Sequence, residues 1–175
     1  MIESERILLR KIELADVNDN YQAWMNDPEV MRYMESRFKT HSMEGIRSYV
    51  QSMLVDPCSC FFAIIDKPTG KHIGNLKFSH IRPVHLTADV GIIIGDKSFW
   101  GRGYAVESLK LAAAYAAKDL KLHKLWAGFY VNNEASIKSF KRAGFVEEGR
   151  FVRHWFFEGD YVDGLQMGLL LEGKP

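Results

Sequence analysis

Two glycines flank an arginine directly before a stretch with helical spacing, and this arrangement can do chemistry. The segment runs from Phe99 to Ala105 with Gly101, Arg102 and Gly103 at its centre. Glycine at a helix entrance serves either a turn that other residues do not tolerate or the close approach of an anion to backbone N–H groups. The start of a helix carries about half a positive charge, so a phosphate group suits it. Both interpretations stay open at this point.

Common nucleotide-binding motifs do not account for the segment. It lacks the G-x-x-x-x-G-K-[ST] pattern of a phosphate-binding P-loop. It also comes late in the chain, without the preceding parallel βαβ unit of a dinucleotide fold. A nucleotide-containing ligand of another kind is needed if the glycines serve an anion.

The two cysteines, Cys58 and Cys60, are two residues apart. A C-x-C pair without a second Cys or His pair at ligand spacing makes a poor zinc site. Alternation along a strand would put both thiols on one face, so we expect reduced strand cysteines and no metal.

The strands and helices that position the glycine segment can be predicted from the spacing of apolar residues along the chain. A strand over about Arg6–Ile12 is followed by helices, one of them capped by Asp16, and then by antiparallel strands. The run Gly91–Ile94 is solidly apolar, which is typical of a strand buried on both faces. A helix over about 104–120, a strand, a helix opened by Asn133 and two C-terminal strands complete the order. The chain is therefore predicted to be α/β in the α+β mixed sense, with a mostly antiparallel mixed sheet of about seven strands flanked by helices.

Length and composition predict one domain over residues 1–175 in the cytoplasm. The chain is 47% hydrophobic and 26% charged, and no apolar run approaches the roughly 20 residues of a membrane span. The first residues lack the apolar stretch of a secretory signal. Because 23 Lys and Arg balance 22 Asp and Glu, with the signs interspersed, we expect no partner held mainly by phosphate contacts, such as a nucleic acid.

Four motifs in order resemble the GNAT superfamily of acyl-CoA-dependent N-acyltransferases, and especially its RimJ/RimL-like branch. They are "SERILLRKIELAD" followed by "WMNDPEVMRYM", then "WGRGYAVE", "NNEASIKSFKRAGF" and "GDYVDGLQMGLL". The resemblance covers nearly the whole chain. It implies a sheet that splays between its fourth and fifth strands, and acetyl-CoA or another short acyl-CoA as co-substrate without a metal.

The resemblance also implies which residues contact the cofactor. The glycine loop would bind the CoA pyrophosphate through its backbone, with Trp100 where the family usually has Arg or Gln. The pantetheine arm would lie along the apolar strand, and a helix-opening asparagine would touch it. These residues are Gly91, Ile92, Ile93, Ile94, Trp100, Gly101, Arg102, Gly103, Tyr104, Ala105 and Asn133. Asn133 could equally be an ordinary helix cap, Arg102 a solvated charge and Tyr104 a packing residue.

Acyl transfer to an amine needs a neutral amine, a polarised carbonyl and a proton for the departing thiolate. Many members of the family have a tyrosine seven residues after the helix-opening asparagine, but here that position is Phe140, which has no hydroxyl. Ser136 is the candidate that the branch implies, and Tyr130 is a second hydroxyl donor. Asp89 stands where related chains often carry an acid, and could take a proton through water.

The resemblance implies transfer of an acetyl or short acyl group to a primary amine. Aromatic residues in the acceptor regions, among them Tyr33, Phe38 and Trp155, favour an amino-sugar or another small-molecule amine. A protein N-terminal acetyltransferase, as for a ribosomal protein, and a CoA-binding module without turnover are the alternatives. We expect a CoA thioester and an amine as partners, no nucleic acid or membrane, and aromatic C-terminal strands that can form a homodimer.

Overall fold

One sheet of eight strands organises the part of the chain that the computed structural model describes, residues 2–171. Its order is β1-β2-β3-β4-β5-β6-β8-β7, and every neighbouring pair is antiparallel except β5 and β6. The strands are β1 (Ile2–Glu3), β2 (Ile7–Lys11), β3 (Cys60–Asp66), β4 (Lys71–Arg82), β5 (Thr87–Ile94), β6 (Lys124–Tyr130), β7 (Val146–Phe157) and β8 (Asp160–Leu170). The predicted mixed, mostly antiparallel sheet is confirmed, and the two-residue β1 accounts for the additional strand.

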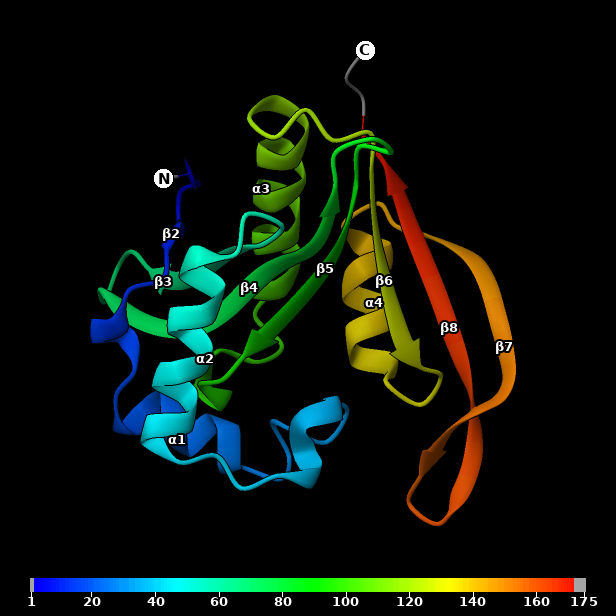
Figure 1. Ribbon diagram of the computed structural model, residues 1–175, viewed down its shortest axis with the longest axis horizontal. Helices are drawn as coiled ribbons and strands as arrows, with labels where there is room; N and C mark the ends of the chain where they lie inside the picture. The colour runs from blue at the N-terminus through cyan, green and yellow to red at the C-terminus, as the bar shows by residue number, and fades with distance from the viewer. Residues whose placement is uncertain (1, 172–175) are drawn as a thin grey trace.

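Helices cover both faces of this sheet (Figure 1). They are α1 (Asp19–Asn26), α2 (Met43–Val55), α3 (Tyr104–Lys118) and α4 (Glu134–Arg142). Neighbouring strand residues face opposite layers, and Phe61 packs in the cluster of α1 and α2. Phe62 belongs to the larger core that α3 and α4 cover. The sheet therefore lies between two helical layers.

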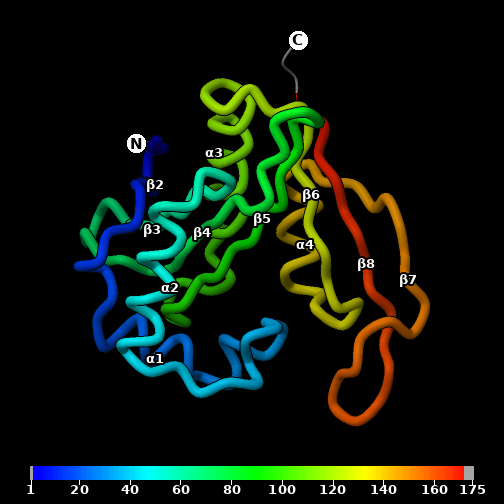
Figure 2. Tube along the Cα trace, in the orientation of Figure 1, coloured from blue at the N-terminus to red at the C-terminus, as the bar shows by residue number. Residues whose placement is uncertain are grey.

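The sheet opens between β5 and β6. These strands pair only from Thr87 to Asp89 on β5 and from Lys124 to Trp126 on β6. Beyond this point β5 continues to Ile94 and β6 to Tyr130, and the two strands diverge, as Figures 1 and 2 show. The splay that the resemblance implied is present. It lies between the predicted fourth and fifth strands, since β5 and β6 hold these places in the sheet when the short β1 is left uncounted.

Two local predictions are wrong. Asn18, not Asp16, caps α1 by accepting a hydrogen bond from Tyr21 N, whereas Asp16 lies in the short 3₁₀ helix Leu14–Asp16. Cys58 lies in an exposed turn, so only Cys60 is a strand cysteine, and both thiols are free. Cys58 N donates to Asp56 Oδ1 over 2.9 Å, which holds Cys58 in the turn between α2 and β3.

Residues 1 and 172–175 of the predicted single domain lie outside the described residues. Over residues 2–171, none of the helices has the length and apolar character needed to span a membrane.

Candidate functional site

A cleft of about 660 Å³ lies where β5 and β6 part, a volume typical of small-molecule sites. Three stretches that are distant in sequence form its walls: the end of β5, the start of α3 with its preceding loop, and the start of α4. The connection between α1 and α2 closes a further side. Of the residues predicted to contact a ligand, the wall contains Ile92, Ile93, Ile94, Trp100, Gly101, Gly103, Tyr104, Ala105, Asn133 and Ser136.

The apolar end of β5 is not buried on both faces, and this prediction is wrong. Ile92, Ile93 and Ile94 are each only half-buried, and Gly91 is exposed. The physical reason is the splay: β6 no longer covers this part of β5, so the apolar strand faces the cleft. A continuous apolar strip along a cleft fits a ligand with a long, weakly polar arm.

The glycine loop needs its glycines for their backbone conformation. Gly101 has φ 72° and Gly103 has φ 84°, both in the left-handed region that side chains with a Cβ disfavour. Space is not the constraint, since an added Cβ on Gly101 would meet no atom within 4 Å. The nearest atom to a Cβ on Gly103 would be Arg6 Nη2 at 3.8 Å. The left-handed turn directs the chain into α3.

The entrance to α3 also leaves backbone donors available. Gly103 is the N-cap and has no side chain to accept from the first turn, whose N–H groups have no acceptor within a helix. The start of α4 lines the same cleft, where Asn133 Oδ1 accepts from Ser136 N over 3.4 Å. Two helix N-termini thus point their positive ends at one cleft, an arrangement suited to an anionic group. Asn133 is both a cap and a wall residue.

The remaining predicted cofactor residues take other positions. The Tyr104 ring is buried and its hydroxyl donates to Asp66 Oδ1 over 2.7 Å, so the side chain packs in the core while the residue also borders the cleft. Arg102 is exposed, and its guanidinium lies 5.8 Å from the centre of the Phe99 ring. Neither Arg102 nor Gly91 lines the cleft.

Asp89 is the last residue of β5 that pairs with β6, and so lies where the split begins. It points to the sheet face opposite Ala88 and Val90, which belong to the core under α3. Its Oδ2 is hydrogen-bonded to His80 Nδ1 at 2.7 Å, while its buried Oδ1 has no partner among the described residues. His80 has φ 49°, in the left-handed region, and lies at an irregularity of β4. Sequence reasoning missed His80, because no spacing pairs it with Asp89.

Tyr130 does not line the cleft. Its hydroxyl donates to Glu35 and accepts from Arg37 Nη1 and Nη2 at 3.0 and 3.1 Å. Burial raises the pKa of Tyr130, Glu35 raises it further, and Arg37 opposes them. The Tyr130 proton is thus directed at Glu35 rather than into the cleft.

Ser136 and Phe140 lie one turn apart on α4 but face different surroundings. Ser136 is half-buried in the wall of the cleft. Phe140 is 2% exposed and packs against Phe129 and Phe145, with ring centres 4.8 and 4.9 Å away. The side chain at position 140 is therefore a core residue in this chain, and Ser136 is the α4 hydroxyl nearest the start of the helix.

Tyr33 is a cleft residue that sequence reasoning named only as an aromatic of the acceptor region. Its hydroxyl donates to the carbonyl of Asn132 over 3.0 Å, and its ring stacks on Phe157 at 5.1 Å. Neighbouring residues of the α1–α2 connection, Glu29, Val30, Arg32 and Met34, line the same cleft. No local sequence pattern predicts that these residues line the cleft, because the folding of the α1–α2 connection brings them to it.

A second cavity of about 640 Å³ adjoins the first, and Arg32 lines both. It lies between the α1–α2 connection and the turn that joins β7 to β8, with Phe38, Phe156 and Phe157 in its wall. Arg32 Nη2 pairs with Glu158 at 2.9 Å and Lys97 pairs with Asp27 at 2.7 Å. Among residues 2–171 no group of three or more His, Cys, Asp or Glu is arranged to hold a metal ion.

Comparison with known proteins agrees with this geometry. Residues 6–146 match the family described as Acetyltransferase (GNAT) domain. The chain is 33% identical over 168 residues to a spermidine N(1)-acetyltransferase of Vibrio cholerae, covering 95% of this chain and 94% of that one. It is 29% identical over 169 residues to an uncharacterized N-acetyltransferase, p20, of Bacillus licheniformis, covering 95% and 94%.

A solved structure shows the same fold. The spermidine N-acetyltransferase from Vibrio cholerae in complex with CoA and spermine superposes with a TM-score of 0.86 at 26% identity, over 96% of this chain and 97% of that one. The family match, the relatives and the cleft agree on acetyl transfer from a CoA thioester to an amine. The chain belongs to the GNAT acetyltransferases and is an acyl-CoA-dependent N-acetyltransferase.

Proposed function

We propose that the protein transfers an acetyl or short acyl group from acyl-CoA to the primary amine of a small molecule, with amino-sugars as the leading class. The observation that carries the CoA part is the continuous surface formed by the half-buried strip Ile92–Ile94 and the glycine loop in one cleft. A ligand that joins an apolar arm to an anionic group fits this surface, with the arm along Ile92–Ile94 and the anionic group at the glycine loop.

In this proposal the backbone of Trp100–Ala105 binds the CoA diphosphate at the entrance of α3. The pantetheine arm lies along Gly91–Ile94, and Asn133 meets it from the start of α4. Arg102 acts through its backbone in this proposal, since its exposed side chain is not part of the cleft wall. The acyl-CoA supplies the acetyl group as a thioester, and the unpaired backbone of β5 beside the split supplies N–H groups to its carbonyl.

Three side chains are proposed for the proton transfers. Asp89, oriented by His80, accepts the amine proton through water from its place at the start of the split, although Asp89 is not among the residues that line the cleft. Ser136 supplies a hydroxyl in the cleft wall for the departing thiolate. Tyr130 is the weaker candidate, because its hydroxyl is already bonded to Glu35 and Arg37.

The charges of the second cavity support an acceptor that is not a polycation. Its only carboxylates are Asp27 and Glu158, and each is paired with a cation. Arg32, Arg37 and Lys39 line the same cavity. A polyamine would meet more positive than negative side chains there, whereas a sugar with one amine would meet aromatic rings and hydrogen-bond donors.

The acidity of the amine points the same way. At pH 7 an amine with a pKa near 10.4 costs about 4.6 kcal/mol to deprotonate, and one near 7.8 costs about 1 kcal/mol. Ring oxygens withdraw electrons from an amino-sugar nitrogen and lower its pKa. A single carboxylate acting through water is adequate for such an amine.

Polyamines are the second candidate class. The relatives named spermidine N(1)-acetyltransferase from Vibrio cholerae and Escherichia coli are 33% and 32% identical to this chain. A protein N-terminus, as the RimJ/RimL-like resemblance implies, remains a third acceptor. We also propose a cytoplasmic location and a homodimer. The apolar side chains exposed along the edge strand β7, among them Val152 and Phe156, support the dimer.

The test is acetyl transfer from acetyl-CoA to a panel of amines: glucosamine and its phosphates, spermidine, an aminoglycoside and a peptide with a free N-terminus. Mass spectrometry identifies the products, because the exposed thiol of Cys58 would react with a thiol dye. We expect the amino-sugars to be acetylated with the highest kcat/KM. Acetylation of spermidine alone, or of the peptide alone, would replace the proposed class with that one.

Ser136→Ala tests the assigned hydroxyl on whichever amine reacts, with Ser139→Ala as the control. Ser139 lines the same cleft one turn later, and its hydroxyl donates to the Ala135 carbonyl over 2.9 Å. We expect kcat to fall for Ser136→Ala and not for Ser139→Ala. Equal activity of both variants would remove Ser136 from the mechanism.

A further inference from the structure

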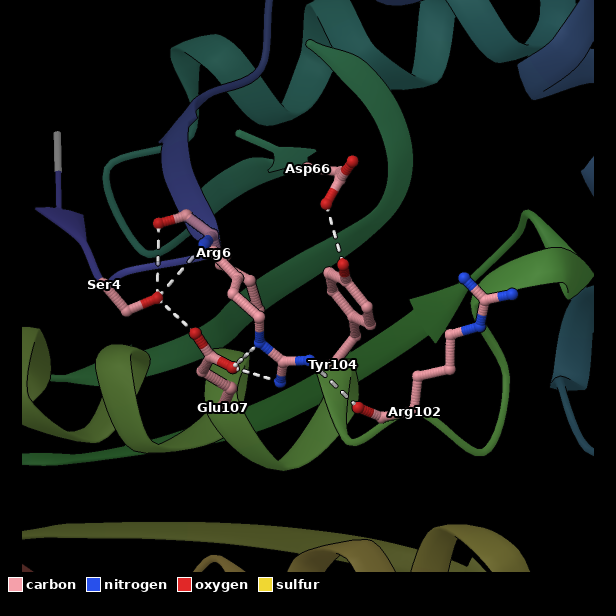
Figure 3. A network of polar contacts seen from close by, with 7 residues as sticks. Ser4, Arg6, Asp66, Arg102, Tyr104 and Glu107 are labelled. Carbon is pink, nitrogen blue, oxygen red and sulfur yellow. Dashed lines mark hydrogen bonds and ion pairs between the residues drawn. The ribbon is translucent and has the colours of Figure 1, made fainter. Parts of the chain in front are cut away.

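One arginine from the start of the chain holds the entrance to α3, as Figure 3 shows. Arg6 Nη1 donates to the carbonyl oxygen of Arg102 over 3.3 Å. Its Nε and Nη2 donate to Glu107 Oε2 over 3.0 and 2.5 Å. The guanidinium carbon also lies 4.7 Å from the centre of the Tyr104 ring. Arg6 therefore contacts the glycine loop, the first residue of α3 and its first turn at once.

Glu107 poses an electrostatic problem for an anion site. It lies in the first turn of α3, where a carboxylate is attracted to the same positive helix end that would attract a diphosphate. Burial raises the pKa of Glu107, but hydrogen bonds from Ser4 and Arg6 outweigh this and lower it, so the side chain is charged near neutral pH. Arg6 supplies the opposite charge and holds the Glu107 carboxylate toward Ser4.

The Tyr104 ring beneath Arg6 is fixed from below. Its hydroxyl donates to Asp66, which is 2% exposed and also accepts from the backbone N–H of Thr69 over 3.1 Å. The ring cannot move without breaking this buried contact. The Tyr104 ring therefore gives the Arg6 guanidinium a fixed surface to pack on, and Arg6 in turn holds the Arg102 carbonyl.

We infer that Arg6 is a positioning residue for the acyl-CoA diphosphate, acting through the Arg102 carbonyl and by neutralising Glu107. The inference rests on the proposed placement of CoA in the cleft. Arg6 engages the Arg102 carbonyl, which leaves the loop N–H groups for the ligand, and it cancels the negative charge of Glu107 in the first turn of α3. Its effect is specific to ligands that carry the diphosphate.

The test compares two ligands on the same variants. CoA carries the diphosphate, whereas pantetheine lacks it together with the nucleotide, and isothermal titration calorimetry gives both dissociation constants. For Arg6→Ala we expect CoA to bind about tenfold more weakly, which corresponds to about 1.4 kcal/mol. Pantetheine binding should stay as in the wild type. Arg150→Ala is the matched control, since Arg150 pairs with Asp163 on the distant β7–β8 pair.

A double variant distinguishes the effect of an unpaired Glu107 charge on CoA binding from an effect on folding. Arg6→Ala combined with Glu107→Gln removes both charges, and we expect it to recover part of the lost CoA affinity. Arg6→Lys keeps the charge without the planar fork, and should bind CoA more tightly than Arg6→Ala. If Arg6→Ala does not fold, Arg6→Lys and Glu107→Gln carry the same comparison.

Three results would overturn the inference: equal losses for CoA and pantetheine, no loss for Arg6→Ala, or no recovery in the double variant. Failure of the wild-type protein to bind CoA is a different result, because it would overturn the proposed CoA site as well.

Discussion

The indole Nε1 of Trp100 donates a hydrogen bond to the carbonyl oxygen of Ile94 over 2.7 Å. This bond joins the start of the glycine loop to the end of β5, so the two surfaces proposed for the anionic group and the apolar arm are held together. Trp100 stands where the family usually has Arg or Gln. It contributes a neutral donor to the backbone of its own chain rather than a charge.

Trp100→Phe keeps an aromatic ring and removes this donor. A hydrogen bond of this kind contributes about 0.5–1.5 kcal/mol, so we expect the KM for acetyl-CoA to rise about two- to twelvefold with kcat little changed. Steady-state kinetics with acetyl-CoA varied measures this. Trp126→Phe, on β6 outside the cleft wall, is the control, and a similar rise in both variants would contradict the assigned role.

Gly103→Ala places a Cβ at φ 84°. Left-handed backbone costs a residue with a Cβ about 1–2 kcal/mol, so thermal unfolding should shift down by about 2–8 °C. CoA binding should weaken as well, because the loop relaxes away from the left-handed turn. Gly149→Ala is the control, since its added Cβ meets no atom within 4 Å and its φ is not positive. Unchanged stability of Gly103→Ala would show that the turn is not constrained.

Asp89→Asn keeps the shape of the side chain and removes the base. General base catalysis contributes about 10²-fold or more, so we expect kcat/KM for the amine to fall by about that factor. His80→Gln should have a smaller effect in the same direction, because it removes only the orienting hydrogen bond at 2.7 Å. The KM for acetyl-CoA serves as the internal control. Full activity of Asp89→Asn would assign the base elsewhere.

Phe140→Tyr restores the residue that many members of the family have at this position. The new hydroxyl would lie in a core site that is 2% exposed. An unpaired buried hydroxyl costs about 1–3 kcal/mol, so we expect a lower melting temperature and no gain in kcat. Differential scanning fluorimetry and kinetics on the same sample check both. A gain in kcat would mean that the α4 start rearranges when acyl-CoA binds.

Acid should destabilise the protein through Asp16. Burial raises the pKa of Asp16, but hydrogen bonds from Arg10 at 2.6 and 2.7 Å and from Glu13 N outweigh it and lower the pKa. A lowered pKa in the folded state adds stability above the unfolded value of about 3.9, and this stability is lost as pH falls further. Urea unfolding from pH 7 to pH 2 should therefore be less pH-dependent for Asp16→Asn. The exposed Asp119→Asn is the control, and parallel pH profiles for wild type and Asp16→Asn would contradict this.

Local sequence patterns determined the elements and the position of the loop. Glycines at 101 and 103 before an amphipathic stretch predict a turn into a helix from residue types alone, and φ values of 72° and 84° agree. Asn133 predicts a helix start in the same way, because a cap needs only neighbours along the chain. The RimJ/RimL-like branch, carried by the ordered motifs, stays a prediction.

What these elements form together depends on how they pack. The half-buried state of Ile92–Ile94 depends on β6 leaving β5 after Asp89, which no pattern within β5 encodes. The Asp89–His80 pair depends on an irregularity in β4, and the placement of Tyr33 in the cleft depends on a connection folding across the sheet. Arg6 and Glu107 meet although 101 residues separate them in the chain. Such contacts arise from the packing of whole elements, and a single sequence carries local propensity but not the distances between its parts.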